Sequence, residues 1–340
     1  MSVKWTHRAA TVEITEVAGD KRRIEVTPAD PKTFISRRRW ETHYPLDLIR
    51  AVFDVKGPIW LCDEIMRDES LTYICFDRSI LGYVEEKAFA GKTILDFGCG
   101  SGGSTMNLAR MFPESSIIGV ELQPKFVDLA RRRAAFYGYE NVAFMLSPSG
   151  CELPEGIGEV DFVVMEAVYE HLLPNERPVI MARLWSLLKP GGLLFLMATP
   201  NRYFLLESHT TGLPLLNYMP AWLALFCART FSCRVKPDES WDSLLRKGVR
   251  GGSVREIKRF LRCDTDHPPI HLEPCRGGLQ DVIDIWYAAS IESRPLMSKR
   301  LLRWILKAVK CCFGVNLVPG LNLAFKKMEE HDDYAGSGKS

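Results

Sequence analysis

The 340-residue sequence lacks the features that would place it in a membrane, in an oxidising compartment or on nucleic acid. No apolar run reaches the ~18 residues that a membrane span needs, and the first 17 residues lack the apolar core of a secretory signal. The ten cysteines include no CxxC pair, so reduced thiols and a cytoplasmic location are expected. A formal net charge of only +2 provides no general attraction for nucleic acid.

A familiar metal-binding spacing is also missing. Four possible zinc ligands recur at intervals of four residues, Cys263, His267, His271 and Cys275. Prolines at 268, 269 and 274 prevent a helix from aligning these side chains, and the spacing matches no zinc finger. The sequence therefore predicts no metal site.

What the chain does contain is an alternation of strand and helix patterns from residue 92 onward. Short apolar runs are expected as strands at 93–95, 117–120, 142–146, 161–165 and 193–198. Helices are expected between them, at 104–112, 125–137 and 182–188. Buried apolar strands separated by helices are typical of a parallel sheet that is covered on both faces.

The two ends of the chain give weaker patterns. Residues 1–35 are expected to hold a short hairpin or a flexible arm, and residues 36–90 look mainly helical. We interpret 1–88 as an N-terminal arm and helical cap, although the helices could equally serve only to cover one face of the core. Residues 329–340 are polar and rich in Gly and Ser, which predicts a disordered tail.

The most informative stretch is KTILDFGCGSGG, at residues 92–103. Asp96 ends an apolar run, and Gly98, Gly100 and Gly102 follow at alternate positions, which lets backbone approach a ligand closely. Together with Gly103 the turn also satisfies the dinucleotide pattern G-x-G-x-x-G. An acid at the end of the next strand, Glu121, suits the ribose of either a dinucleotide or another nucleoside cofactor. The turn alone does not decide between a dinucleotide and another nucleoside cofactor.

Further segments favour one of these cofactors. A carboxylate at Asp96 suits a cationic ligand better than a pyrophosphate, and GVEL, EAVYEHL, LLKPGG and ATPNR follow in order. Together with LDFGCGSGG they resemble the class I S-adenosylmethionine-dependent methyltransferases, most closely the small-molecule branch similar to ubiquinone-biosynthesis methyltransferases. The resemblance implies a Rossmann-like α/β fold over residues 89–328, with a mainly parallel seven-stranded sheet. It implies a terminal antiparallel strand within 317–325.

The resemblance also implies the cofactor-binding residues. Asp96 and the three alternate glycines would line the methionine and ribose parts of S-adenosylmethionine. Glu121 would bind the ribose hydroxyls, and Leu122 would lie against the adenine. The family's aspartate near the adenine amine is missing, so Ser149 is the expected substitute. Glu166 is expected on the cofactor side of the site.

Catalytic candidates follow the fourth and fifth predicted strands. Methyl transfer from a sulfonium needs an in-line approach and, for a protonated nucleophile, a base. His171 is the first candidate for a base or for a group that orients the substrate, although in this family such a Glu-His pair often only stabilises the loop. His209 is the second, and Tyr203 and Glu207 could position a substrate.

An insertion at 201–252 is expected before the end of the fold. Its apolar stretch 213–231 predicts a hydrophobic lid over an apolar or aromatic acceptor, with ordinary core packing as the alternative. A capped helix is expected at 253–261, where Ser253 and Glu256 form a capping-box pattern.

A second amphipathic stretch lies at 298–313, where basic residues share one helical face. Such a helix can lie weakly on an anionic membrane or can pack on its own domain.

The sequence thus predicts methyl transfer from S-adenosylmethionine, with S-adenosylhomocysteine as product, to a small apolar or aromatic acceptor. The alternatives are a lipid or protein acceptor and an inactive, cofactor-binding regulatory scaffold. An NAD-dependent oxidoreductase is the remote option. A nucleic-acid partner is not expected, because the Asn/Asp-Pro-Pro-Tyr motif is also missing after the fourth strand.

Overall fold

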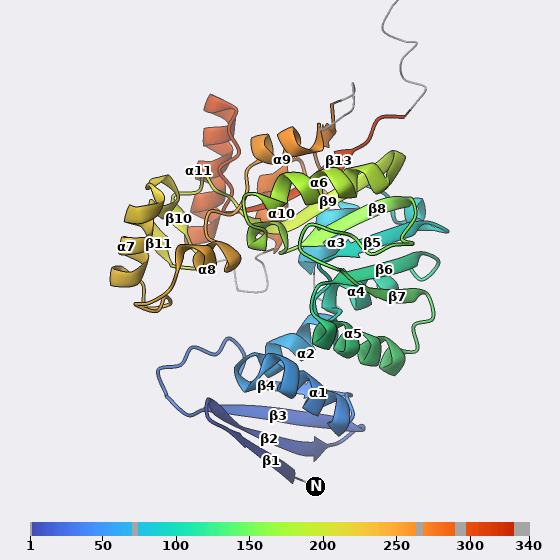
Figure 1. Cartoon of the computed structure of the whole chain (residues 1–340), viewed down its shortest axis with the longest axis vertical. Helices are drawn as coiled ribbons and strands as arrows, with labels where there is room; N and C mark the ends of the chain where they lie inside the picture. Colours follow the sequence, from blue (N-terminus) through green and yellow to red (C-terminus); the bar gives the residue numbers. More distant parts are fainter. Residues whose placement is uncertain (1, 70–73, 263–267, 290–296, 330–340) are drawn as a thin grey trace, which may run out of the picture.

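The computed structural model describes residues 2–69, 74–262, 268–289 and 297–329. A small N-terminal unit of strands and helices packs against a larger α/β domain, and an insertion projects from another side of that domain, at the left in Figure 1. The predicted tail at 329–340 lies outside the described residues except for its first residue.

The larger domain is built on a seven-stranded sheet with the order β12-β13-β9-β8-β5-β6-β7. Its strands are β5 (Thr93–Phe97), β6 (Ser116–Glu121), β7 (Val142–Leu146), β8 (Val160–Glu166), β9 (Leu188–Pro200), β12 (Ile270–Leu272) and β13 (Gly320–Lys326). Strands β5 to β9 pair in parallel, and β13 pairs antiparallel with β9. The predicted Rossmann-like sheet and its terminal antiparallel strand are confirmed.

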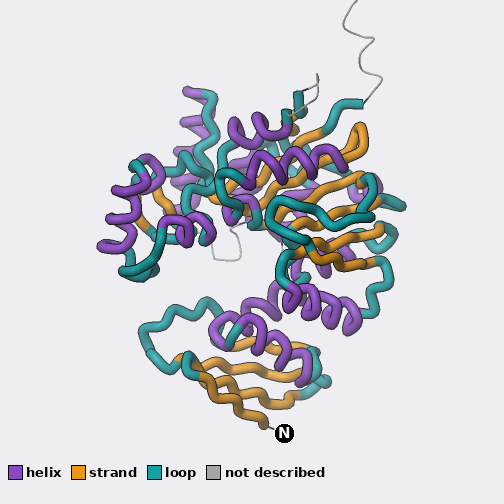
Figure 2. Tube along the Cα trace, viewed as in Figure 1, coloured by secondary structure: helices purple, strands orange, loops and turns teal. Residues whose placement is uncertain are grey.

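Helices cover both faces of this sheet (Figure 2). They are α3 (Ile74–Leu81), α4 (Gly103–Met111), α5 (Pro124–Tyr137), α6 (Glu176–Leu187), α9 (Val254–Leu261) and α10 (Val282–Ala289). Apolar residues of α6 and α9 share one buried cluster with the sheet, and those of α3, α4 and α10 share another. The chain leaves β5 toward β6 on one side and returns to β8 on the other. This reversal opens a crevice at the carboxyl ends of the strands, where open α/β sheets bind ligands.

The N-terminal unit is a four-stranded antiparallel sheet covered by two helices. Its elements are β1 (Ser2–His7), β2 (Ala10–Val17), β3 (Lys21–Pro28), β4 (Arg39–Thr42), α1 (Leu46–Lys56) and α2 (Leu61–Glu69). Every second residue at the start of β2 is buried under these helices, while β1 is largely exposed. The sheet is larger than the short hairpin or arm expected from the sequence.

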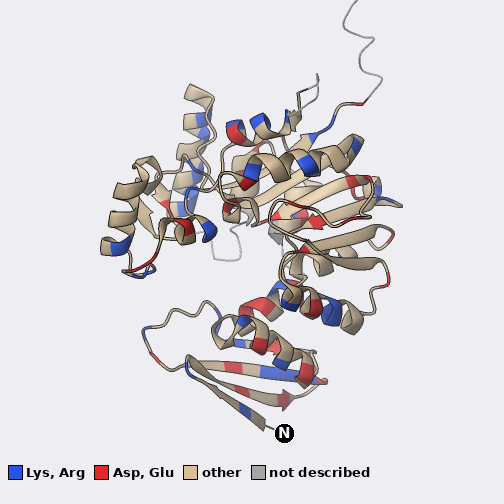
Figure 3. Cartoon of the chain, in the orientation of Figure 1, with Lys and Arg blue, Asp and Glu red and all other residues tan. Residues whose placement is uncertain are grey.

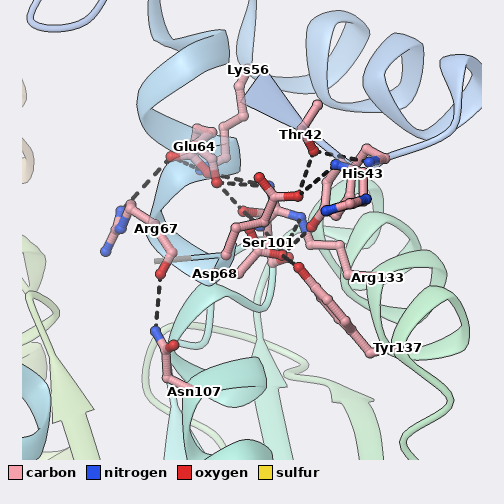
Figure 4. A network of polar contacts seen from close by, with 12 residues as sticks. Thr42, His43, Lys56, Glu64, Arg67, Asp68, Ser101, Asn107, Arg133 and Tyr137 are labelled. Carbon is pink, nitrogen blue, oxygen red and sulfur yellow. Dashed lines mark hydrogen bonds and ion pairs between the residues drawn. The ribbon is translucent and has the colours of Figure 1, made fainter. Parts of the chain in front are cut away.

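A buried arginine joins the N-terminal unit to the sheet domain (Figure 4). Arg133 of α5 is fully buried, with Nε 3.7 Å from Asp68 and Nη2 3.9 Å from Glu64, both on α2. Its Nη1 donates to the carbonyl and hydroxyl oxygens of Ser101, each at 3.1 Å. Ser101 in turn donates its hydroxyl proton to Glu64 at 2.9 Å. Because Ser101 belongs to the glycine-rich turn, α2 directly supports that turn.

The insertion after β9 folds around its own apolar cluster. It contains β10 (Leu206–Glu207), β11 (Leu213–Pro214), η4 (Leu216–Tyr218), α7 (Ala221–Phe231) and α8 (Trp241–Arg246). Helix α7 lies at the far end of the insertion, away from the sheet (Figure 1), and Trp222 and Phe226 on it are exposed. Ser253 caps α9 through the N–H of Glu256, as the sequence predicts.

The basic amphipathic segment forms α11 (Met297–Phe313), whose Lys and Arg positions are coloured blue in Figure 3. Three of its basic residues, Arg303, Lys307 and Lys310, bind aspartates at the start of α10. Arg303 binds Asp284 at 2.7 Å, and Lys307 binds Asp281 and Asp284 at 2.8 Å each. Contact with a membrane stays a prediction. None of the helices in the described part of the chain combines the length and apolar character that a membrane crossing requires.

Candidate active site

The glycine-rich turn follows β5 and borders the crevice. Gly98 and Gly102 have φ of 73° and 90°, in the left-handed region. A Cβ at Gly98 would lie 2.6 Å from the Val168 side chain, and one at Gly102 would lie 2.9 Å from the Ala130 side chain. A Cβ at Gly100 would have no heavy atom within 4 Å. Two glycines therefore permit close packing, and the one between them leaves open backbone that a ligand can approach.

Asp96 lies buried beneath this turn. One of its carboxylate oxygens accepts hydrogen bonds from the hydroxyls of Ser104 and Thr105, each at 2.7 Å. The other oxygen, Oδ1, is buried and has no hydrogen-bond partner. Burial raises the pKa of the carboxyl to about 7, against the two hydroxyl hydrogen bonds, which lower it. A cationic or amine-bearing ligand would satisfy this unpaired oxygen, so the site fits the sulfonium cofactor implied by the sequence.

Glu121 stands at the end of β6, next to the turn. Its Oε2 accepts the N–H of Gly100 at 3.0 Å, and Oε1 accepts the N–H groups of Leu122 and Gln123 at 2.8 and 2.9 Å. These three bonds fix the carboxylate where a ribose is expected. Leu122 is half-exposed beside it, which leaves a face for adenine.

The segment after β7 reaches the same edge of the sheet. The N–H of Ser147 donates to the carbonyl of Glu121 at 2.8 Å. Ser149 accepts from the N–H of Cys151 at 3.3 Å and donates to Glu152 at 3.0 Å. Its hydroxyl is thus held within its own loop, and its contact with adenine stays a prediction.

A cavity of about 490 Å³ opens at the carboxyl ends of β8 and β9. Its lining includes Glu166, Met197 and His209, with the aromatic residues Phe76 and Trp286 from α3 and α10. The volume falls in the range of small-molecule sites. Glu166 contributes to both the cavity and the charged surroundings of Asp96, and its place on the cofactor side stays a prediction.

The backbone is strained where these two strands end. Ala167 and Ala198, next to β8 and near the end of β9, have φ of 52° and 56°. Non-glycine residues in the left-handed region cost energy and persist only where the surrounding structure holds them, often at functional sites.

The two candidate histidines lie together, next to a buried carboxylate. The ring centroids of His171 and His209 are 5.7 Å apart, and His171 Nε2 is 3.9 Å from Glu170 Oε1. Burial lowers the pKa of both imidazoles and raises the pKa of Glu170 to about 7. Both histidines are therefore neutral at pH 7 and can accept a proton.

The same three residues are the group that could hold a metal ion among the described residues. One ligand atom from each of Glu170, His171 and His209 lies within 4.8 Å of the others. Glu170 accepts a hydrogen bond from Thr199 at 3.2 Å, and its buried Oε1 accepts none. The sequence did not single out this set. Of the residues it did consider for zinc, Cys263 and His267 lie outside the described residues, and the ring of His271 stacks on Phe325.

Tyr203 does not join the histidines. It lines a different cavity, beyond the loop 248–252, and is half-exposed there. Glu207 is buried and accepts the N–H groups of His209, Thr210 and Thr211 at 3.1, 2.9 and 2.6 Å. Its role is therefore to hold the backbone that carries His209.

The expected lid does not line the cavity at β8 and β9. In the described part of the chain, the insertion contributes only Ser208 and His209 to that lining. Residues 217–221 instead line the cavity that contains Tyr203. Closure of 213–231 over an acceptor stays a prediction.

The sequence reasoning missed the support given by Arg133 and Glu64. Nothing near Glu64 resembles a motif, and Arg133 is one of three consecutive arginines, of which the other two are exposed. The sequence offered no signal that singled out either residue.

Comparisons with known proteins agree with this geometry. Residues 94–192 match the family model described as "Methyltransferase domain". The chain is 32% identical over 36% of its length to a ubiquinone biosynthesis O-methyltransferase from Shewanella pealeana, covering 50% of that protein. It is 33% identical over 29% of its length to a tRNA(Thr) (cytosine(32)-N(3))-methyltransferase from Saccharomyces cerevisiae, covering 17% of it. The chain thus spans half of these relatives or less, and they differ in acceptor.

A solved structure of an S-adenosylmethionine-dependent methyltransferase from Clostridium acetobutylicum is also similar. It is 17% identical and aligns with a TM-score of 0.38 over 47% of this chain and 62% of that one. The family match covers the glycine-rich turn, Glu121 and the loop of His171, and it ends before the loop of His209. Residues 94–192 are thus similar to a methyltransferase domain.

Proposed function

We propose that the whole chain transfers a methyl group from S-adenosylmethionine to a small acceptor bound in the cavity beside His209. The observation that carries this proposal is the position of that cavity, at the carboxyl ends of β8 and β9, of which β8 pairs with the strand β5 that leads into the glycine-rich turn. A site in this position can hold an acceptor against the methyl group of a cofactor bound over β5 and β6.

The residues of the site divide the chemical work. S-adenosylmethionine supplies a methyl group on a sulfonium, so the bond from carbon to sulfur breaks as the acceptor's bond to carbon forms. Asp96 and Glu121 would hold the methionine and ribose parts of the cofactor. His209, neutral at pH 7 and on the lining of the cavity, accepts the proton that the attacking atom loses. The charge of Glu207 raises the pKa of His209 and so favours the protonated imidazole, whereas the neighbouring His171 lowers it.

The lining of the cavity favours an acceptor with an apolar or aromatic part. Phe76, Trp286 and Met197 offer apolar surface, while Asn322 and Ser79 offer hydrogen bonds. The volume of about 490 Å³ suits a small molecule. A lipid or protein acceptor would have to place a single side group in this cavity. An inactive scaffold would not explain why a neutral histidine lines it.

Ligand binding tests the cofactor first. S-adenosylmethionine and S-adenosylhomocysteine should each raise the melting temperature in proportion to the logarithm of their concentration above the dissociation constant. NAD should leave it unchanged. A shift with NAD alone would contradict the proposal.

Replacement of His209 tests the base. We expect His209→Gln to lower the turnover number by roughly 10²–10³-fold in an acceptor screen and to leave the affinity for S-adenosylhomocysteine unchanged. His43→Gln, on an exposed position of the N-terminal unit, is the matched control and should be fully active. Full activity of the His209 variant would exclude it as the base.

A further inference from the structure

We propose that a second cavity, formed by the insertion with α6 and α9, binds a phosphate-bearing anion. The cavity measures about 1110 Å³ and lies beyond the loop 248–252 from the methyl-transfer site. Its lining contains five arginines, Arg177, Arg202, Arg250, Arg255 and Arg259. Among the described residues that line it, Glu256 is the one carboxylate. This excess of cationic groups in one concave site needs an anion to balance it.

Arg177 is built into the wall of the cavity. It is 2% exposed, its Nε donates to the carbonyl of Leu172 at 3.1 Å, and its Nη1 donates to Glu256 at 3.1 Å. Its Nη2 is buried and has no hydrogen-bond partner. Glu256 also accepts the hydroxyl of Tyr169 at 2.9 Å, so this single acid is already shared. A buried guanidinium with a free N–H pair calls for an acceptor that the chain does not supply.

Arg250 is a second buried cation on the same cavity. It is 9% exposed, and its guanidinium donates to the carbonyls of Asn217 and Met219. No ion pair to a carboxylate is found for it among the described residues. Burial lowers its pKa, and the like charge of the nearby Arg202 lowers it further. An anion between them would relieve that repulsion.

The number and shape of these groups favour phosphate. Guanidinium groups bind phosphate oxygens through paired N–H donors. Arg255 and Arg259 stand one turn apart on α9 and are both exposed toward solvent, which gives an anion a route of entry. A monocarboxylate would neutralise only part of this charge. The aromatic rings of Tyr203, Tyr218 and Trp241 complete the wall and can stack on the rest of the ligand.

The cavity is distinct from the methyl-transfer site, although one loop touches both. A Cβ at Gly248 would lie 2.8 Å from His209 Nε2 and 3.1 Å from the Glu170 side chain. Arg250, two residues later, lines the arginine cavity. The phosphate could be that of a soluble ester or that of a lipid headgroup, and the chemistry at the arginines is the same for both.

Calorimetry with sodium pyrophosphate tests the proposal on the full chain. We expect saturable binding to the unaltered protein, and an increase in the dissociation constant of at least about tenfold for the double variant Arg255→Gln/Arg259→Gln. Lys258→Gln removes one positive charge from α9 at a residue that does not line the cavity, so this variant should bind pyrophosphate like the unaltered protein. Both positions in the double variant are exposed, so its melting temperature should be unchanged.

The absence of pyrophosphate binding would overturn the proposal. Equal binding by the double variant would overturn it as well, because the anion would then be held elsewhere, for example at the glycine-rich turn. Sedimentation with phosphatidylglycerol vesicles separates the two sources. Vesicle binding that pyrophosphate displaces supports a lipid headgroup, and failure to sediment alongside tight pyrophosphate binding supports a soluble phosphate ester. None of these readouts requires methyl transfer.

Discussion

Asp96 combines a buried position with a carboxyl whose pKa lies near neutrality, at about 7. In the cofactor-free protein the raised pKa favours the protonated form. Its contribution to stability is therefore fully present below the ordinary carboxyl pKa and is lost as pH rises through about 7. A cationic ligand reverses this preference, because it attracts the ionised carboxylate.

The first prediction concerns this carboxyl. Affinity for S-adenosylmethionine should rise with pH, by up to about tenfold per pH unit below pH 7 and little above it. Asp96→Asn should bind more weakly at pH 8 and lose the dependence, as measured by calorimetry across the pH range. Glu170→Gln removes the other carboxyl that has a pKa near 7, and this variant should keep the pH dependence of the affinity for S-adenosylmethionine. A flat profile in the unaltered protein would count against the contact.

Arg133 is a second residue whose replacement is expected to change the protein strongly, in this case its free energy of unfolding. We expect Arg133→Met to reduce the free energy of unfolding by about 3 kcal/mol, because Asp68 would be left buried without its partner. Arg132→Met changes the exposed neighbour in the same helix and should cost under about 0.5 kcal/mol. Urea unfolding compares the two. Equal losses would show that burial of Arg133 contributes nothing specific.

At the scale of elements, α11 shows why charge patterns mislead. The sequence correctly predicts a helix there, but it does not show which groups the basic residues of that helix bind. Their partners, Asp281 and Asp284, lie just before and within α10, and a single sequence does not reveal that pairing. On the apolar side of α11, Leu306 is buried and Leu302 is half-buried, whereas Leu301 and Trp304 are exposed.

A third prediction follows from these pairs. Lys307 lowers the pKa of both aspartates. These ion pairs therefore contribute to the free energy of unfolding above the ordinary pKa of aspartate, and the contribution is lost as pH falls below about 4. Lys307→Met should therefore cost about 1–2 kcal/mol at pH 7 and much less at pH 3. Arg300→Met, on an exposed position of the same helix, is the control. A cost that does not change with pH would point to lost packing instead.

The strands differ in how far the sequence could predict them. The parallel strands of the sheet domain are buried on both faces and are therefore continuous apolar runs, such as that of β8. The N-terminal strands alternate and carry charged residues on their open side, so β1, with no fully buried residue, left almost no signal. Glycines and acids at strand ends were enough to predict a cofactor side of the site. The position of His209 depends on an insertion whose fold has no sequence motif, and the arginine cavity depends on arginines that lie up to 82 positions apart in the sequence.

At the scale of the whole molecule, the glycine-rich turn lies between the N-terminal unit and the sheet. The hydroxyl of Ser101 and the guanidinium of Arg133 connect it to α2. Whatever orders the turn should therefore also order α2.

A fourth prediction tests this connection by hydrogen exchange. Addition of S-adenosylhomocysteine should slow amide exchange in α2, because a ligand that orders the glycine-rich turn would also hold the hydrogen bond from Ser101 to Glu64. Exchange in α7, which belongs to the insertion, should not change. Equal slowing of both helices would indicate general stabilisation of the chain, and no slowing of α2 would show that the turn and the N-terminal unit are independent.

The contact between Ser101 and α2 has a consequence for regulation. Coupling between two sites is reciprocal, so a cofactor that stabilises the docked position of α2 must bind more tightly when that position is already held. The edge strand β1 is a surface on which another strand could pair. A molecule that binds there and moves the sheet and α2 toward or away from the domain would change the dissociation constant of S-adenosylmethionine. The cofactor would change the dissociation constant of that molecule by the same factor. A molecule bound to the N-terminal unit would thus act on the affinity for the cofactor without contact with the cavity beside His209.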